Sequence, residues 1–235
     1  MKQFSRQSLL IGEEKTKKLI NSSVIVFGLG GVGGFTIESL SRAGIGTITL
    51  VDFDTVDITN LNRQIIAAHS SIGKEKTKLF KDRILDINPN AIVNIHNLRV
   101  TSENAKTLFD HIKYDYIVDA IDTVSAKLAL IEISKDKNIP IISSMGFGNK
   151  LDPTTIQIAD ISKTSVCPLA RTIRKELKKR RIKKVKTVFS TETATKPNNL
   201  NGSREKAVNV GSVSFVPSVA GLIIAGEVIK DLIKN

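Results

Sequence analysis

A glycine-rich loop behind an apolar run constrains this chain more than any other feature. The loop, residues 28–33 (GLGGVG), follows residues 24–27 (VIVF) and precedes a helical pattern over residues 33–43. A glycine loop between a strand and a helix places backbone N–H groups and the positive helix end against a phosphate. The sequence therefore predicts a nucleotide site at the carboxyl end of the first strand of an α/β fold.

Strands and helices alternate through residues 1–150. We expect strands at 24–27, 47–51, 92–95, 116–120 and 140–143, separated by helices at 33–43, 74–87, 102–111 and 125–136. This alternation is typical of a doubly wound, mostly parallel, Rossmann-like sheet.

Residues 151–235 read as a C-terminal extension of the same domain. In it we expect a strand within 152–161, a basic helix at 169–180 opened by Pro168, a strand at 185–189, a long mobile loop at 191–210 and a core helix at 217–233. The chain is thus interpreted as a single domain, with a nucleotide-binding core at 1–150 and a basic, RNA-facing segment and returning helix at 151–235.

Positive charge is concentrated in one short segment. The chain has a formal net charge of +12, and residues 171–186 alone contribute +9. Such a cluster suggests a polyanionic partner. The candidate nucleic-acid contacts are Arg171, Arg174, Lys175, Lys178, Lys179 and Arg181. The alternative is a solvated amphipathic helix with Leu169, Ile173 and Leu177 turned inward.

Composition excludes several classes of protein. The single Cys167 allows neither an intramolecular disulfide nor a zinc site built on several thiolates, and it fits a reducing, cytoplasmic compartment. The N-terminus has no apolar core of the kind found in signal peptides. The apolar stretch 215–229 contains Pro217 and Glu227 and is short for a bilayer, so we expect a core helix and no membrane partner. The three histidines are dispersed and form no metal-binding pattern with one another.

Polar residues follow the second and fourth expected strands. Asp52 ends the second strand, where a carboxylate can bond ribose hydroxyls, and this feature alone fits NAD- and FAD-binding folds equally well. Asn60, Arg63 and Lys76 come next, and a triphosphate needs such cations to neutralise a leaving pyrophosphate. Asp122 follows the fourth strand and suits Mg²⁺. The alternative is that Arg63 and Lys76 are solvated and that Asp122 caps the next helix.

Several of these pieces together resemble the ubiquitin-activating-enzyme superfamily, the adenylating enzymes that also serve thiamin and molybdopterin synthesis. The matching segments are FSRQ around Arg6, GLGGVG, GIGTITLVDFDTVDITNLNRQ, GKEK around Lys76 and DAID ending at Asp122. The resemblance implies attack of a substrate carboxylate on the α-phosphate of ATP, with no protein nucleophile in that step.

The resemblance also implies a role for each matching residue. Gly28, Gly30 and Gly31 pack on the nucleotide, Asp52 with Asp54 beside it lies at the ribose, Asn60, Arg63 and Lys76 hold phosphates, Asp122 coordinates Mg²⁺, and Arg6 reaches the phosphates from the other subunit of a homodimer. Arg6, Arg63, Lys76 and Asp122 would be the catalytic set.

The second half resembles one branch, the tRNA threonylcarbamoyladenosine dehydratases. The resemblance rests on ISKTSVCPLARTIRKELKKRRI and on the ending GSVSFVPSVAGLIIAGEVIKDLI. It implies ATP-dependent cyclisation of threonylcarbamoyladenosine in tRNA, through an adenylated carboxylate and with net loss of water.

Other functions remain open at this stage. The main alternative is adenylation of the C-terminus of a ubiquitin-like sulfur carrier, with a sulfur-carrier or cysteine desulfurase partner. Cys167 would then be a candidate thiol, although a packed or surface position suits it better. A non-catalytic, nucleotide-binding RNA adaptor and a nicotinamide-dependent oxidoreductase are further alternatives.

Overall fold

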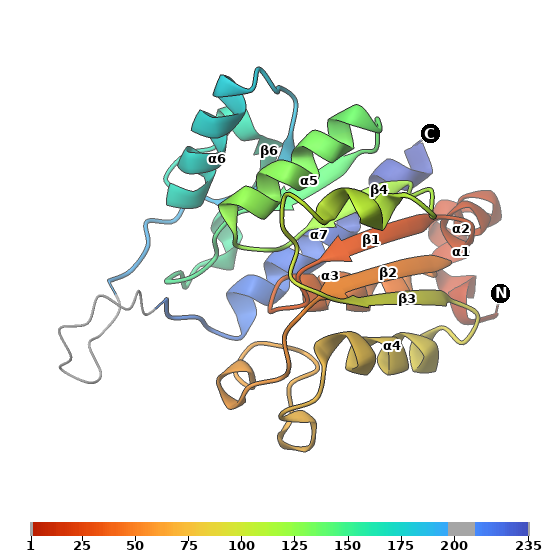
Figure 1. Cartoon of the computed structure of the whole chain (residues 1–235). Helices are drawn as coiled ribbons and strands as arrows, with labels where there is room; N and C mark the ends of the chain where they lie inside the picture. The colour runs from red at the N-terminus through yellow and green to blue at the C-terminus, as the bar shows by residue number, and fades with distance from the viewer. Residues whose placement is uncertain (1, 197–209, 235) are drawn as a thin grey trace.

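One twisted sheet organises the molecule (Figure 1). The computed structural model describes residues 2–196 and 210–234. Its strands are β1 (Ser23–Phe27), β2 (Thr47–Asp52), β3 (Ile92–Asn97), β4 (Tyr116–Asp119), β5 (Ile141–Ser144), β6 (Ile156–Asp160) and β7 (Lys186–Ser190). They lie in the order β3-β2-β1-β4-β5-β7-β6, and only β6 runs antiparallel to its neighbour. The predicted doubly wound, mostly parallel sheet is confirmed.

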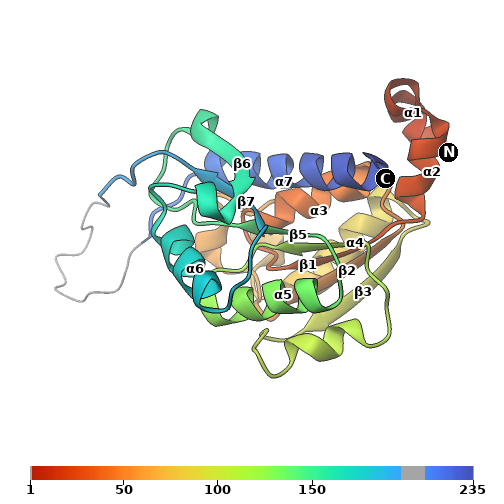
Figure 2. The ribbon, with the colours of Figure 1, turned by 90° about the horizontal axis from the view of Figure 1, so that it is seen from above.

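Helices cover both faces of this sheet (Figure 2). They are α1 (Ser5–Ile11), α2 (Glu13–Ile20), α3 (Gly33–Arg42), α4 (Lys76–Ile87), α5 (Val124–Asp136), α6 (Pro168–Lys179) and α7 (Phe215–Lys234). On one face α3 contacts both α4 and α7, and on the other α5 contacts α6. The segment that follows the first 150 residues therefore adds two strands and two helices to the same three-layer body.

Strand residues alternate between two hydrophobic cores. Val24 and Val26 of β1 pack with α3 and α7, whereas Ile25 and Phe27 pack with α5 and α6, and all four are 0% exposed. A parallel strand covered on both faces needs such a continuous apolar run. The helix at the C-terminus is a core helix as predicted, with Ile224 and Val228 fully buried. Within the described residues, no helix is long and apolar enough to cross a bilayer.

Some expected elements differ from the structure. The helix predicted at 102–111 is wrong: a five-residue 3₁₀ helix, Ala105–Phe109, stands there instead. Asn104 explains the difference, because its side chain accepts from Thr101 N (2.8 Å) and donates to Arg99 O (2.8 Å), which holds a turn in place of a first helical turn. The strand predicted from 152 begins only at Ile156, after a 3₁₀ turn that Pro153 opens.

Other differences lie at the two ends. The helices α1 and α2 were not predicted, and Gly12, with φ +90°, separates them. Of the loop expected at 191–210, residues 191–196 form no helix or strand, and 197–209 lie outside the described residues.

Candidate active site

A cavity of about 660 Å³ opens where β1, β2 and β4 end. Parallel strands collect ligands at this edge, where the connections leave to opposite faces of the sheet. The cavity brings together every nucleotide-site residue predicted from the sequence except Arg6: Gly28, Gly30, Gly31, Asp52, Asp54, Asn60, Arg63, Lys76 and Asp122.

The glycine loop is packed backbone to backbone. Gly28 has φ +85°, and a Cβ there would lie 2.7 Å from the carbonyl oxygen of Ala120. A Cβ on Gly33, the first residue of α3, would lie 1.8 Å from the carbonyl oxygen of Gly28. Only glycine fits these two positions, so the loop leaves backbone N–H groups and the start of α3 available to an anion.

Asp52 supports the loop from the end of β2. Its carboxylate accepts from Leu29 N (2.6 Å) and Asp54 N (2.8 Å), and the residue is 9% exposed. Each oxygen keeps a lone pair that can accept from a hydroxyl. Beside it, the guanidinium of Arg99 lies 4.4 Å from the ring centroid of Phe53, a cation–π contact on the cavity wall that was not predicted.

Lys76 is held inside the cavity wall. Its side chain is only 5% exposed, and Nζ donates to Asp54 Oδ2 at 3.0 Å. A buried ammonium with one carboxylate partner keeps donors for a phosphate. The alternative of a solvated surface charge is therefore wrong for Lys76.

A 3₁₀ turn, Ile58–Asn60, places the next two polar groups. Asn60 Oδ1 accepts from Asp57 N (3.2 Å), and Arg63 Nη1 donates to Thr59 O (2.7 Å) and Asn62 Oδ1 (2.9 Å). The hydrogen bond from the Thr59 hydroxyl, with one from its N–H, holds the pKa of Asp57 below its usual range. The two hydrogen bonds of Arg63 Nη1 anchor one edge of its guanidinium, which has further N–H donors for a phosphate.

Gln64 presents a buried, unpaired acceptor to the cavity. It lines the cavity, is 7% exposed, and its Oε1 has no hydrogen-bond partner. A buried acceptor left unpaired is costly, so this atom suits a donor on a bound molecule. Gln64 was not predicted from the sequence, although it lies directly after Arg63.

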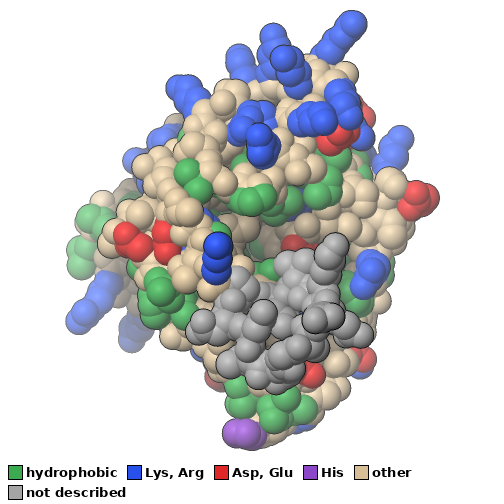
Figure 3. All heavy atoms as spheres, turned by 90° about the vertical axis from the view of Figure 1, so that its left-hand side faces the viewer, with side chains coloured by type: hydrophobic (Ala, Val, Ile, Leu, Met, Phe, Trp, Pro, Cys, Tyr) green, Lys and Arg blue, Asp and Glu red, His purple; other side chains and the backbone are tan. Residues whose placement is uncertain are grey.

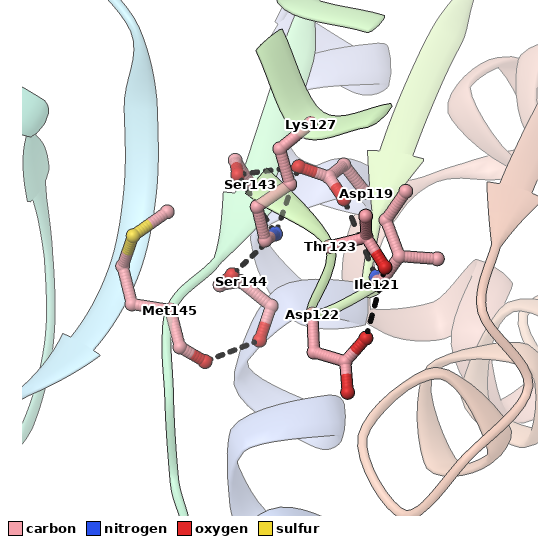
Figure 4. Close-up of polar contacts among 8 residues, drawn as sticks. All are labelled: Asp119, Ile121, Asp122, Thr123, Lys127, Ser143, Ser144 and Met145. Atoms are coloured by element: carbon pink, nitrogen blue, oxygen red, sulfur yellow. Dashed lines mark hydrogen bonds and ion pairs between the residues drawn. The ribbon is translucent and has the colours of Figure 1, made fainter. Parts of the chain in front are cut away.

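Asp122 stands exposed beyond the end of β4 (Figure 4). Its carboxylate accepts from the Thr123 hydroxyl at 3.4 Å, and it forms no ion pair within the described residues. Thr123, not Asp122, is the N-cap residue of α5, and within the described residues the Asp122 carboxylate accepts no backbone N–H of that helix, so the helix-cap alternative for Asp122 is wrong. Its carboxylate can join phosphate oxygens around Mg²⁺, an ion that keeps few protein ligands.

The basic cluster covers α6 and the residues after it. Figure 3 shows Lys and Arg side chains gathered over the upper part of the face that lies on the left in Figure 1, where α6 lies. Of the six predicted nucleic-acid contacts, four are exposed and form no ion pair in the described part of the chain: Arg171, Lys175, Lys178 and Arg181. Lys179 pairs with Glu176 (2.6 Å), and Arg174 is half-buried.

The inner face of α6 also follows the prediction. Ile173 and Leu177 are buried in the core, and Leu169 is partly buried against it. Arg174 donates to Thr164 O at 2.8 Å and to Thr164 Oγ1 at 2.5 Å, so it fastens the helix to the preceding turn. Helix α6 therefore has both predicted features: an apolar face packed on the core and a cationic face exposed to solvent.

Arg6 lies apart from the cavity. It is exposed on α1, which sits at the opposite end of the sheet (Figure 1). Its neighbours Leu9 and Leu10 are 89% and 86% exposed, an unusual pair of bare apolar side chains. Cys167 is buried at 3% exposure, which agrees with the packed position that the sequence favoured. Phe147 and Phe189 pack in the two cores.

Comparison with known proteins identifies the family of this chain. The ThiF family model matches residues 4–235, nearly the whole chain. The chain belongs to the ThiF family.

Relatives within the ThiF family narrow the comparison. The tRNA threonylcarbamoyladenosine dehydratase of Bacillus subtilis is 46% identical over 243 residues, covering 99% of this chain and 95% of that protein. The Haemophilus influenzae enzyme of the same name is 36% identical, covering 93% and 88%. The crystal structure of Escherichia coli tRNA N6-threonylcarbamoyladenosine dehydratase in complex with ATP superposes with a TM-score of 0.90, at 34% identity, covering 99% of this chain and 94% of that one. The predicted resemblance is confirmed.

Proposed function

We propose that this ThiF-family chain is an ATP-dependent enzyme that cyclises threonylcarbamoyladenosine in tRNA. The observation that supports this most is a single cavity holding the glycine loop together with Arg63, Lys76 and Asp122. Relatives that match the chain almost end to end bear the name of this activity, and one is solved with ATP.

The cavity suits ATP with Mg²⁺. Gly28 and Gly33 leave no room for a side chain, Gln64 Oε1 can accept from a donor on the nucleotide, and Asp122 has an exposed carboxylate at the rim. We assign Asp52 and Asp54 to the ribose side and Asn60, Arg63 and Lys76 to the phosphates. Bound Mg²⁺ would neutralise phosphate oxygens beside Asp122.

The reaction needs charge neutralisation and orientation rather than a protein nucleophile. A carboxylate oxygen of the threonyl group forms a bond to the α-phosphorus, and the bond to pyrophosphate breaks. Arg63 and Lys76 stabilise the charge that develops on the departing phosphates. The neighbouring carbamoyl group then attacks the acyl carbon, closes a five-membered ring and releases AMP, so one water is lost overall from the nucleoside.

The basic face of α6 is the proposed tRNA contact. Contacts from Lys and Arg to phosphates dominate the affinity of proteins for nucleic acids. Arg171, Lys175 and Lys178 of α6, with Arg181 just after the helix, are exposed and form no ion pair among the residues that the structure describes. Lys179 and Arg174 lie beside them. A tRNA substrate would place the enzyme in the cytoplasm.

A homodimer would complete the site. Arg6 cannot serve its own cavity from the far end of the sheet, and the exposed Leu9 and Leu10 give α1 an apolar face to bury. We therefore propose that α1 packs on a second copy and delivers Arg6 to its phosphates. The sulfur-carrier alternative has less support, because the only cysteine is buried.

Nucleoside analysis tests the proposed function directly. Purified protein is incubated with ATP, Mg²⁺ and tRNA that contains threonylcarbamoyladenosine, and the digested nucleosides are weighed by mass spectrometry. We expect conversion to a product lighter by one water, with one AMP released per product. A protein that leaves the nucleoside unchanged but adenylates a sulfur carrier would refute the proposal.

A further inference from the structure

A fully buried ion pair joins α5 to the end of β4 (Figure 4), next to Ala120 and Ala126, which line the cavity. Lys127 of α5 and Asp119 at the end of β4 are both 0% exposed, with Lys127 Nζ 2.9 Å from Asp119 Oδ2. Lys127 Nζ also donates to Ser144 O (2.7 Å) and to Ser143 Oγ (3.3 Å). The Ser143 hydroxyl in turn donates to Asp119 Oδ2 at 2.6 Å.

The cluster uses all the hydrogen-bonding capacity of the ammonium. Lys has three N–H donors, and all three have an acceptor here. A buried ion pair adds little stability compared with apolar side chains of similar volume, because desolvation offsets the attraction. The network therefore fixes the positions of the strand ends that it joins more than it stabilises the fold.

Two strand ends depend on that geometry, and the first of them leads into the turn that lines the cavity. Asp119 Oδ1 accepts from Ile121 N (3.3 Å), which shapes the turn between β4 and α5 that ends in Asp122. The same turn presses the carbonyl of Ala120 against Gly28. On the other side, Lys127 holds the carbonyl of Ser144, the last residue of β5, where the chain leaves for Met145.

We propose that Lys127 is a positioning residue for adenylation. Through Asp119 it fixes the turn that presents Asp122 to the nucleotide, and through Ser144 it fixes the next strand end, on the side of α6. This inference rests on the proposed function. It assigns Lys127 no contact with either substrate, since the side chain is fully buried.

A charge-neutral double variant separates positioning from stability. Lys127→Met combined with Asp119→Asn removes both charges and leaves neither buried alone, so we expect it to fold. ATP affinity measured without Mg²⁺ should be unchanged, because the glycine loop and Asp52 remain intact. The kcat for AMP release should fall about 10- to 100-fold, as is usual when residues that orient a site are removed. The Mg²⁺ concentration at half-maximal rate should rise.

A second neutralised pair is the control. Glu38 and Arg83 join α3 to α4 outside the cavity (2.6 Å), so Glu38→Gln with Arg83→Met should change the melting temperature while leaving kcat and the Mg²⁺ requirement at wild-type values. If the Lys127 double variant does not fold, the same measurements are made on Ser143→Ala, which removes only one hydroxyl of the network and should leave the fold intact. A lowered kcat with unchanged ATP affinity supports the inference.

Two results would overturn the inference. One is a folded variant with wild-type kcat and Mg²⁺ requirement. The other is a loss of activity that only follows a loss of ATP affinity. Wild-type protein that releases no AMP with modified tRNA refutes the proposed function itself, whereas a wild-type-like variant refutes the positioning role alone.

Discussion

Lys76 and Asp122 line the same cavity at opposite extremes of exposure. Lys76 is buried and paired with Asp54, whereas Asp122 is exposed and forms no ion pair within the described residues. Asp122→Ala should therefore reduce ATP–pyrophosphate exchange by about 100-fold or more, since it removes a group that acts on developing charge. Its free energy of unfolding should change by less than about 0.5 kcal/mol, as for other exposed positions.

Lys76→Met is the matched comparison at this scale. It should also abolish exchange, but with a clear fall in melting temperature, because Asp54 loses its partner. Thermal melts beside the exchange assay check both variants. Full exchange activity in Asp122→Ala would remove that carboxylate from the site.

Single site residues were predictable from the sequence where a polar or glycine residue directly follows a predicted strand. The glycine loop, Asp52 and Lys76 each follow a clear apolar run or helix start, so they could be placed on one rim. Lys127 was missed because a charged residue inside a helical pattern is normally assigned to the solvated face. Its signal was the apolar stretch on both sides, 126–131, which leaves no solvated face for it there.

Among the elements, α6 has two faces with separate tests. Replacing Lys175, Lys178 and Arg181 by Gln should weaken tRNA binding and lower its salt dependence by about one unit of slope for each phosphate that the variant no longer neutralises. Replacing Lys15, Lys17 and Lys113, which are exposed at the other end of the sheet, should change neither. Binding titrations at several salt concentrations give both slopes, and equal slopes in the two triple variants would contradict an RNA-binding role for α6.

Helix α7 is fastened to β7 by a pH-dependent contact. Burial alone would raise the pKa of Glu227, but Lys186 at 2.8 Å and Lys230 at 2.7 Å outweigh it and lower the pKa to about 2. A depressed carboxylate pKa stabilises the fold above its unfolded value near 4.5 and loses that contribution as the pH falls towards 2.

Glu227→Gln should therefore destabilise the protein at pH 7, by about 1 kcal/mol given solvent screening. The difference between variant and wild type should vanish as the pH approaches 2. Chemical denaturation at stepped pH measures it, with Glu132→Gln, a half-exposed partner of Arg180, as a comparison expected to show a smaller effect. A difference that stays constant with pH would contradict the assignment.

Elements that contain a clear apolar run were predictable from the sequence. Strands β1 to β5 and helices α3, α4 and α5 follow apolar runs in the sequence, and they lie where they were predicted. The 3₁₀ helix at Ala105–Phe109 was predicted as an α-helix, because the hydrogen bonds of the Asn104 side chain determine the local fold and a hydrophobic pattern does not show such bonds. Helix α1 buries none of its own residues, so it carries no amphipathic signal.

For the whole molecule, the decisive question is whether Arg6 acts across subunits. Arg6→Ala and Asp122→Ala should each be inactive alone. When the two are mixed and allowed to exchange subunits, random pairing should restore about a quarter of wild-type activity, because half the dimers then hold one intact site. A mixture that stays inactive despite exchange would place Arg6 outside the partner's site.

Helix α7 spans the molecule from cavity to far edge. Near its start Pro217 lies against Gly31, and near its end Asp231 accepts from Tyr116 at 2.7 Å and pairs with Lys186. The last described turn is thus anchored on the side away from the glycine loop (Figure 1). Tethering the protein to a sensor surface through an affinity tag after this helix would turn the cavity and α6 toward the solution, which suits kinetic measurements with an RNA as bulky as tRNA.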